Sequence, residues 1–156
     1  MRNFLVIETA MINTAKTLLA FDYGLRHIGV AVGQTLISSS NPAGIVRARD
    51  GGPDWNTIAK LINEWQPQLL LVGLPLNMDG TDSPMSLRAR KFSRQLHEKY
   101  KIAVELVDER LSSFAAKQAR KEAQSSIDFG KDTVDAEAAC IILQDYYNRT
   151  PATPQQ

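Results

Sequence analysis

The chain carries Leu-Leu-Ala-Phe-Asp at residues 18–22, an apolar run that ends in a carboxylate. A second such run, Val-Glu-Leu-Val-Asp-Glu, occupies residues 104–109. Each is typical of a buried strand that delivers an acid to its carboxyl end, which is the end of an open α/β sheet where ligands bind. A third acid, Asp135, opens an alanine-rich helical pattern. We therefore expect three carboxylates from distant segments to meet at one edge of a sheet.

The length of 156 residues suits one domain with a substantial core. The chain is 44% hydrophobic and 22% charged, as in soluble globular proteins. No apolar run approaches the ~18 residues of a membrane span, and the apolar patch near the N-terminus is too short for an export signal. We therefore expect a cytoplasmic protein without membrane contact. The single cysteine, Cys140, excludes an internal disulfide and a cysteine-based metal site, and is expected to be buried.

Apolar spacing predicts five strands, over 17–23, 28–32, 43–49, 69–72 and 102–107. Helices are predicted over 55–65, 84–100, 113–123 and 133–147, with Asp54, Ser83, Ser112 or Ser113, and Asp132 or Thr133 as N-caps. Residues 1–16 are interpreted as an N-terminal extension, 17–148 as one domain, and 149–156 as a disordered tail.

This element order predicts an α/β fold with a mixed five-stranded sheet. The first three strands follow each other closely and form an antiparallel meander. The last two are separated by helices, so they should add in parallel through right-handed crossovers, with helices on both faces. The first strand is then central.

Three acids are the candidate catalytic residues and metal ligands: Asp22, Glu109 and Asp135. Carboxylates without histidine or cysteine suit the hard cations Mg²⁺ or Mn²⁺, and a pair of such ions promotes phosphodiester hydrolysis. Other interpretations exist, since Asp22 could cap the turn at Gly24 and Asp135 could complement a helix dipole. Strand alternation places Asp108 and Glu109 on opposite sides, and Glu109 is chosen as the one nearer the opening.

Basic residues near the same edge are candidates for holding phosphates, although such residues are often only a solvated surface. A turn over 77–80 could touch substrate or be a plain turn. His27 is close to Asp22 in sequence and is considered for a minor substrate role. The candidate nucleic-acid-binding residues are Arg26, Asn77, Arg88, Arg110 and Lys131. A net charge of +1 gives no strong overall attraction for nucleic acid.

Four segments, in order, resemble motifs of the YqgF family of bacterial Holliday-junction-resolvase-like proteins. They are residues 19–33 (Leu-Ala-Phe-Asp-Tyr-Gly-Leu-Arg-His-Ile-Gly-Val-Ala-Val-Gly), residues 72–81 (Val-Gly-Leu-Pro-Leu-Asn-Met-Asp-Gly-Thr), residues 107–113 (Val-Asp-Glu-Arg-Leu-Ser-Ser), and Lys131 with Asp135, Ala136, Ala138 and Ala139. The resemblance spans roughly residues 17–148. The chain departs from it at Gly33-Gln34, where many members carry Ser-Asp.

The resemblance implies an RNase H-like fold and a metal-dependent endonuclease, with Asp22, Glu109 and Asp135 at the matching acidic positions. Its implied substrate is structured RNA, through processing of the 5′ end of pre-16S rRNA, with ribosomal particles as possible partners. Cleavage of branched DNA, as by a Holliday junction resolvase, is the alternative.

Two further hypotheses are a non-catalytic RNA- or ribosome-binding module and an ATP-binding domain. Asp-Tyr-Gly with trailing glycines also looks like the first phosphate motif of the actin and sugar-kinase group, but those proteins close two such domains around the nucleotide. The sequence contains no Gly-x-Ser-x-Gly elbow, no Gly-x-x-x-x-Gly-Lys-Ser/Thr loop and no His-Glu-x-x-His motif. It gives no oligomeric state.

Overall fold

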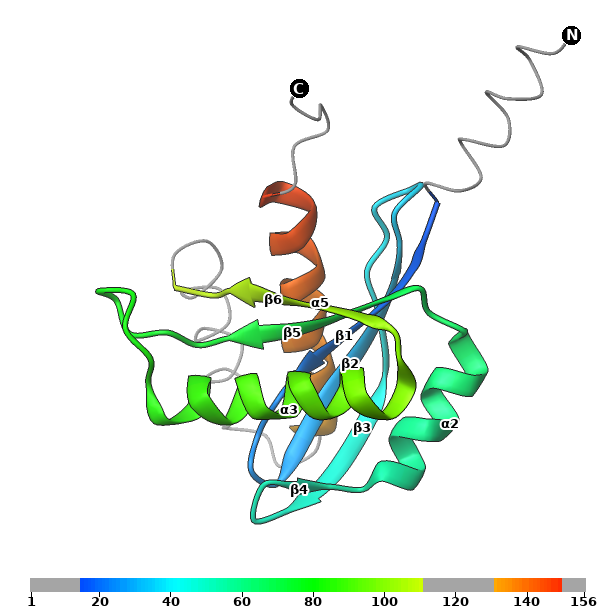
Figure 1. The fold of residues 1–156 in the computed structure, drawn as a ribbon. Helices are drawn as coiled ribbons and strands as arrows, with labels where there is room; N and C mark the ends of the chain where they lie inside the picture. Colours follow the sequence, from blue (N-terminus) through cyan, green and yellow to red (C-terminus); the bar gives the residue numbers. More distant parts are fainter. Residues whose placement is uncertain (1–14, 111–130, 150–156) are drawn as a thin grey trace, which may run out of the picture.

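One mixed sheet organises the structure, a computed structural model that describes residues 15–110 and 131–149. Its strands are β1 (Thr17–Asp22), β2 (His27–Gln34), β3 (Asn41–Arg49), β4 (Gly52–Pro53), β5 (Leu69–Leu74) and β6 (Ala103–Asp108). Their order across the sheet is β4-β3-β2-β1-β5-β6. β1 is antiparallel to β2 and parallel to β5, which is parallel to β6 (Figure 1). The predicted α/β class, the mixed sheet and the central first strand are confirmed.

The sequence prediction missed β4, which lies between the strand predicted over 43–49 and the helix predicted over 55–65. Asp50 and Gly51 adopt left-handed conformations, with φ of 50° and 84°, and reverse the chain after β3. Gly52 and Pro53 then pair with the end of β3. Two residues are too few to show apolar periodicity. The turn conformation therefore decides that this additional strand forms.

Helices cover both faces of the sheet. α2 (Trp55–Trp65) and α3 (Pro84–Tyr100) lie on one face, and α5 (Lys131–Arg149) lies on the other, so that α3 is in front and α5 behind in Figure 1. Leu19 and Phe21 of β1 join the core under α2 and α3, whereas Leu18 and Ala20 join the core under α5. A strand covered on both faces needs apolar residues at every position, which explains the unbroken apolar run.

Capping explains where the first two helices begin and end. Asp54 and Ser83 are the N-caps, as predicted. Asp54 accepts a hydrogen bond of 3.1 Å from the amide of Asn56, and Ser83 forms a capping box ahead of Pro84. α2 ends where Gln66 turns left-handed and its amide donates to the carbonyl of Ile62. α2 therefore ends at Trp65, where the predicted helix also ends.

The last helix begins earlier than predicted. α5 starts at Lys131 and already includes Asp132 and Thr133, which were the expected N-caps. Acidic side chains are favourable inside the first turn as well as before it, so the sequence pattern does not separate the two placements. The helix also extends to Arg149 rather than ending near Tyr147. In the described ranges, no helix has the length and apolarity that crossing a bilayer requires.

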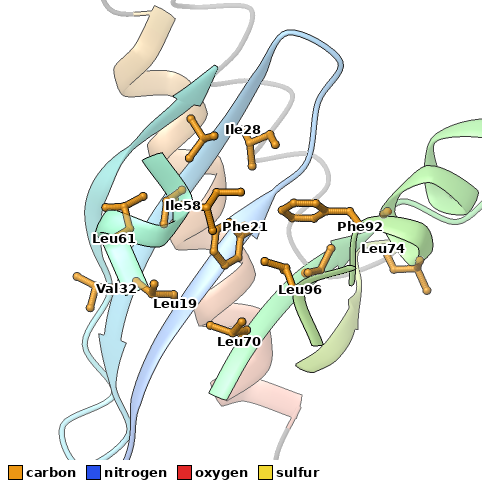
Figure 2. Close-up of a cluster of buried hydrophobic side chains, with 14 residues drawn as sticks. Leu19, Phe21, Ile28, Val32, Ile58, Leu61, Leu70, Leu74, Phe92 and Leu96 are labelled. Atoms are coloured by element: carbon orange, nitrogen blue, oxygen red, sulfur yellow. The ribbon is translucent and has the colours of Figure 1, made fainter. Parts of the chain in front are cut away.

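Phe92 of α3 is the centre of the core on the α2/α3 side. Its ring centroid lies 5.6 Å from that of Phe21 in β1, 5.1 Å from that of Tyr23 and 5.8 Å from that of Trp55. The labelled side chains of Figure 2 show Phe92 pointing toward Phe21, among leucines and isoleucines of the same core. These aromatic contacts fix both helices against the central strand.

α5 lies against β2 at a glycine. A Cβ atom on Gly29 would collide with the carbonyl oxygen of Asp135 and come within 2.9 Å of the amide nitrogen of Ala136. The two backbones are in direct contact, which a residue without a side chain permits. Gly29 also pairs with Asp22 between β2 and β1, so this contact places Asp135 beside the end of β1.

Some expectations fall outside the described residues. The predicted helix over 113–123 lies there, as do residues 1–14 of the expected extension and residues 150–156 of the expected tail. The domain boundaries at residues 16 and 148 therefore stay predictions. Cys140 is buried, as expected.

Replacing Gly29 with alanine should lower the free energy of unfolding by about 1–3 kcal/mol, because a backbone contact cannot yield as a flexible side chain would. Urea denaturation of Gly29→Ala and the parent chain measures this. Gly52→Ala is the matched control, since its Cβ atom would come no closer than 3.3 Å to the carbonyl oxygen of Arg49. Equal stability of parent and Gly29→Ala would contradict the direct contact of α5 with β2.

Candidate active site

Asp22 ends the central strand on the α5 side of the sheet. Along β1, Leu18 and Ala20 pack in the core under α5, and alternation gives Asp22 the same face. Its backbone pairs with Gly29 of β2. On its other side Phe21 is in register with Val72 of β5, so the next residue of β5, Gly73, lies at the level of Asp22. The acid is therefore bordered by a glycine on each neighbouring strand.

Asp135 reaches this place from α5. Its backbone contacts Gly29, and the helix continues with Ala139 and Ile142 in the core under α5. Its Oδ2 atom lies 4.0 Å from Nδ1 of His27, the first residue of β2. An ion pair at this distance forms when the imidazole is protonated. His27, weighed in the sequence for a minor role, is thus beside one of the three candidate acids.

Glu109 follows β6 and is buried, with 8% of its surface exposed. A Cβ atom on Gly73 would collide with its Oε2 atom and would also meet Cδ1 of Ile142 from α5 at 2.7 Å. The carboxylate therefore lies on the α5 side, over β5. The amide of Glu109 donates to the carbonyl of Leu74 at 3.2 Å, which fixes the backbone at this point.

Asp108 has a different environment. It is in register with Leu74, which belongs to the core on the α2/α3 side, so Asp108 faces away from α5. Arg110 donates to both of its carboxylate oxygens, at 2.9 Å from Nη2 to Oδ2 and 3.3 Å from Nε to Oδ1. These hydrogen bonds hold the pKa of Asp108 below its ordinary value, and the same pairing raises the pKa of Arg110. Of the two neighbouring acids, Glu109 is the one on the side of Asp22 and Asp135.

The donor chemistry of the three acids fits a hard divalent cation, because carboxylate oxygens are the ligands that Mg²⁺ and Mn²⁺ prefer. The spatial arrangement of these three side chains, however, does not form a complete metal site. Within residues 15–110 and 131–149, no three histidine, cysteine or acidic side chains converge closely enough to hold one metal ion. The structure thus brings the acids to one end and one face of the sheet, and binding of an ion requires their side chains to converge further.

The predicted phosphate-binding residues are spread around this end. Arg26 is exposed in the turn between β1 and β2, and the side chain of Lys131 lies outside the described residues. Arg88 is exposed on α3, across the sheet from α5, where its Nη1 atom would lie 3.1 Å from a Cβ atom on Gly51. Arg110 is engaged with Asp108 and also donates to the carbonyl of Met78.

Asn77 holds the loop between β5 and α3. Its Nδ2 atom donates to Oγ1 of Thr81 at 3.0 Å and to the carbonyl of Asp82 at 3.2 Å. Asp79 accepts from the amide and hydroxyl of Thr81, which lowers the pKa of Asp79. The alternative of a structural turn therefore accounts for the present contacts of Asn77, and a contact with nucleic acid stays a prediction.

Two further cations at this end were not selected from the sequence. Arg47 and Arg49 close β3, and with Arg26, His27 and Asp50 they line an open cavity of about 330 Å³. Their signal in the sequence was the Arg-x-Arg spacing, which puts two cations on one side of a strand. Their closeness to His27 depends on the pairing of β2 with β3.

The fold and the position of the acids define an RNase H-like α/β domain with acidic side chains at the end of its central strand. The family model described as RuvX, Holliday junction resolvase, matches residues 16–149, and the chain belongs to this family. The family resemblance found in the sequence is thereby confirmed.

Relatives similar to this chain carry the name "Putative pre-16S rRNA nuclease". The one from Marinobacter nauticus is 50% identical over 129 residues, which cover 83% of this chain and 90% of that protein. The one from Escherichia coli O7:K1 is 47% identical over 133 residues, which cover 85% of this chain and 96% of that protein. With the family, these names confirm the expected enzyme class, a hydrolase of the nuclease type.

A solved structure of Thermus thermophilus RuvC in complex with a Holliday junction substrate has a similar fold. The TM-score is 0.51 at 12% sequence identity, and the match covers 85% of this chain and 94% of that chain. At this identity the likeness supports the RNase H-like fold.

Asp108→Asn should reduce the stability of the folded chain at pH 7 and have little effect in acid. Because Arg110 depresses the pKa of Asp108, the carboxylate stabilises the folded state above its unfolded pKa of about 3.9, and this contribution is lost as the pH falls through the lower folded value. Urea denaturation of both chains at pH 7 and near pH 3 measures the difference, which should be small because the pair is partly exposed. A difference that persists undiminished in acid would contradict the assigned pairing.

Proposed function

We propose that this protein is a metal-dependent endonuclease that hydrolyses phosphodiester bonds in structured nucleic acid, and that its substrate is the 5′ region of pre-16S rRNA. The observation that carries the proposal is the arrival of Asp22, Glu109 and Asp135, from three separate elements, at one end and one face of the sheet. The names of the relatives from Marinobacter nauticus and Escherichia coli support the choice of substrate. Such a substrate implies a cytoplasmic location and contact with ribosomal particles.

The three acids would hold Mg²⁺ or Mn²⁺, and either ion when bound supplies activation of a water molecule and stabilisation of charge at the leaving oxygen. The chain contributes the arrangement of the donors. Gly73 leaves space for the carboxylate of Glu109, and Gly29 lets α5 bring Asp135 close. Burial of Glu109 keeps one donor away from bulk water. His27 stands beside Asp135, where a protonated imidazole would attract a phosphate oxygen.

A four-way DNA junction is the second candidate substrate. The description of the family, Holliday junction resolvase, favours it. The acids and cations of the proposed site would contact phosphates rather than bases, and such groups do not distinguish RNA from DNA. The comparison of both substrates therefore belongs in the same experiment.

Asp22→Asn should lower the cleavage rate by about 100-fold or more, because it removes negative charge where the reaction needs a fixed ligand. The assay follows a pre-16S rRNA fragment and a four-way DNA junction with Mn²⁺ and with chelator. Glu64→Gln, an exposed acid on α2, is the matched control and should cleave like the parent chain. Equal cleavage by Asp22→Asn and the parent would overturn the site. No cleavage of either substrate by the parent would favour a non-catalytic binding module.

Millimolar Mg²⁺ or Mn²⁺ should raise the melting temperature, since an ion that binds only the folded chain stabilises it. Each kcal/mol of linked binding free energy is worth about 2–4 °C for a chain of this size. Asp135→Ala should lose most of the rise, and Glu64→Gln should keep it. Differential scanning fluorimetry with and without chelator measures both shifts. An undiminished rise in Asp135→Ala would remove Asp135 from the metal site.

A further inference from the structure

The turn between β3 and β4 separates two basic hollows. The first is the cavity of about 330 Å³ that Arg26, Arg47 and Arg49 line. The second has a volume of about 230 Å³ and is lined by Arg88 and Lys91 of α3, together with Gly51 and Tyr23. Asp50 lines both hollows and is the acidic residue among their lining side chains. We call the five cations Arg26, Arg47, Arg49, Arg88 and Lys91 the basic edge surface.

The five cations of the basic edge surface form no ion pair within the described residues. The ion pairs found within residues 15–110 and 131–149 are His27 with Asp135, Arg90 with Asp82, and Arg110 with Asp108. None of them involves the basic edge surface, which therefore presents five positive charges around one carboxylate. Charges of one sign along a hollow raise the local concentration of ligands of the opposite sign. The surface thus favours an anionic ligand.

The shape of the surface favours an extended anion over a compact one. The two hollows lie on either side of the β3–β4 turn, and their cations come from a turn, a strand end and a helix. Arg47 and Arg49 are two residues apart on β3, a spacing of about 6–7 Å along a strand. That spacing is close to the distance between successive phosphates of a nucleic-acid strand. Guanidinium groups also match phosphate geometry with paired N–H donors.

His27 connects this surface to the candidate active site. It lines the first hollow, and its Nδ1 atom lies 4.0 Å from Oδ2 of Asp135. Arg47 is the register partner of His27 on the neighbouring strand. A strand whose scissile bond lies at the three acids can therefore pass His27 and continue over Arg47 and Arg49.

We propose that the basic edge surface binds the phosphate backbone of the substrate on one side of the cleavage site. The inference rests on the proposed nuclease function and deepens it. It assigns Arg47 and Arg49, with Arg26, Arg88 and Lys91, to binding of a nucleic-acid segment that is not itself cut. Such contacts position the substrate without reading its bases, and they make affinity dependent on salt.

The test measures binding separately from cleavage. Fluorescence anisotropy with a labelled pre-16S rRNA fragment and a labelled four-way DNA junction is recorded in chelator, at several salt concentrations, for the parent chain and for Arg47→Gln/Arg49→Gln. The double variant should bind at least 10-fold more weakly at low salt. The slope of log affinity against log salt should become shallower by about 2, one unit for each lost phosphate contact.

Two further double variants make the result interpretable. Lys16→Gln/Lys60→Gln removes the same charge from exposed positions, Lys16 ahead of β1 at the far end of the sheet and Lys60 on α2, and should keep the affinity and slope of the parent. Arg88→Gln/Lys91→Gln changes exposed residues of α3 and should lose affinity even if the β3 variant folds poorly. Circular dichroism melting verifies the fold of each chain.

The outcomes separate the inference from the proposed function. Unchanged affinity and slope in both edge variants, with tight binding by the parent, would overturn the basic edge surface and leave the nuclease proposal standing. Equal losses in the edge variants and the control would show a general charge effect and also overturn it. Failure of the parent chain to bind either nucleic acid would overturn both proposals.

Discussion

The direct contact between the backbone of α5 and Gly29 of β2 is the constraint on which the rest of the structure depends. α5 supplies the helical cover on one face of the sheet within the described residues, and its apolar side chains complete that core. Because no side chain separates the helix from the strand, α5 lies close enough to the sheet for Asp135 to reach the level of Asp22. The same contact therefore packs α5 against the sheet and positions Asp135 in the candidate active site.

Glycine has a second role on the other side of Asp22. Gly73 leaves the space that the carboxylate of Glu109 occupies, between β5 and Ile142 of α5. The central acid is thus bordered by two glycines, one approached by a helix and one by a carboxylate. A larger residue at either position would move an acid away from the strand end, so these glycines are constraints on the site as much as on the fold.

Strand alternation divides the acids at the end of β6 between two tasks. Asp108 faces the α2/α3 side and is neutralised by Arg110, which also contacts the β5–α3 loop. Glu109 faces α5 and joins the candidate site. Arg110 was predicted from the sequence to hold phosphate, but its donors are used in hydrogen bonds to Asp108 and to the β5–α3 loop. Arg47 and Arg49 at the end of β3 instead line an open hollow. Arg26, Arg47 and Arg49 therefore face solvent at this end, whereas Arg110 does not act as a free cation.

The sequence by itself determined the class of fold, the central strand, the first two helix starts and the three candidate acids, because apolar periodicity, caps and local motifs are properties of neighbouring residues. It did not determine the two-residue strand β4, the start of α5, the pairing of Asp108 with Arg110, or the placement of Arg47 beside His27. Each of these depends on a turn conformation or on contacts between segments far apart in the chain. Tertiary structure alone decided them, since the position of a side chain in space is set by the elements packed around it.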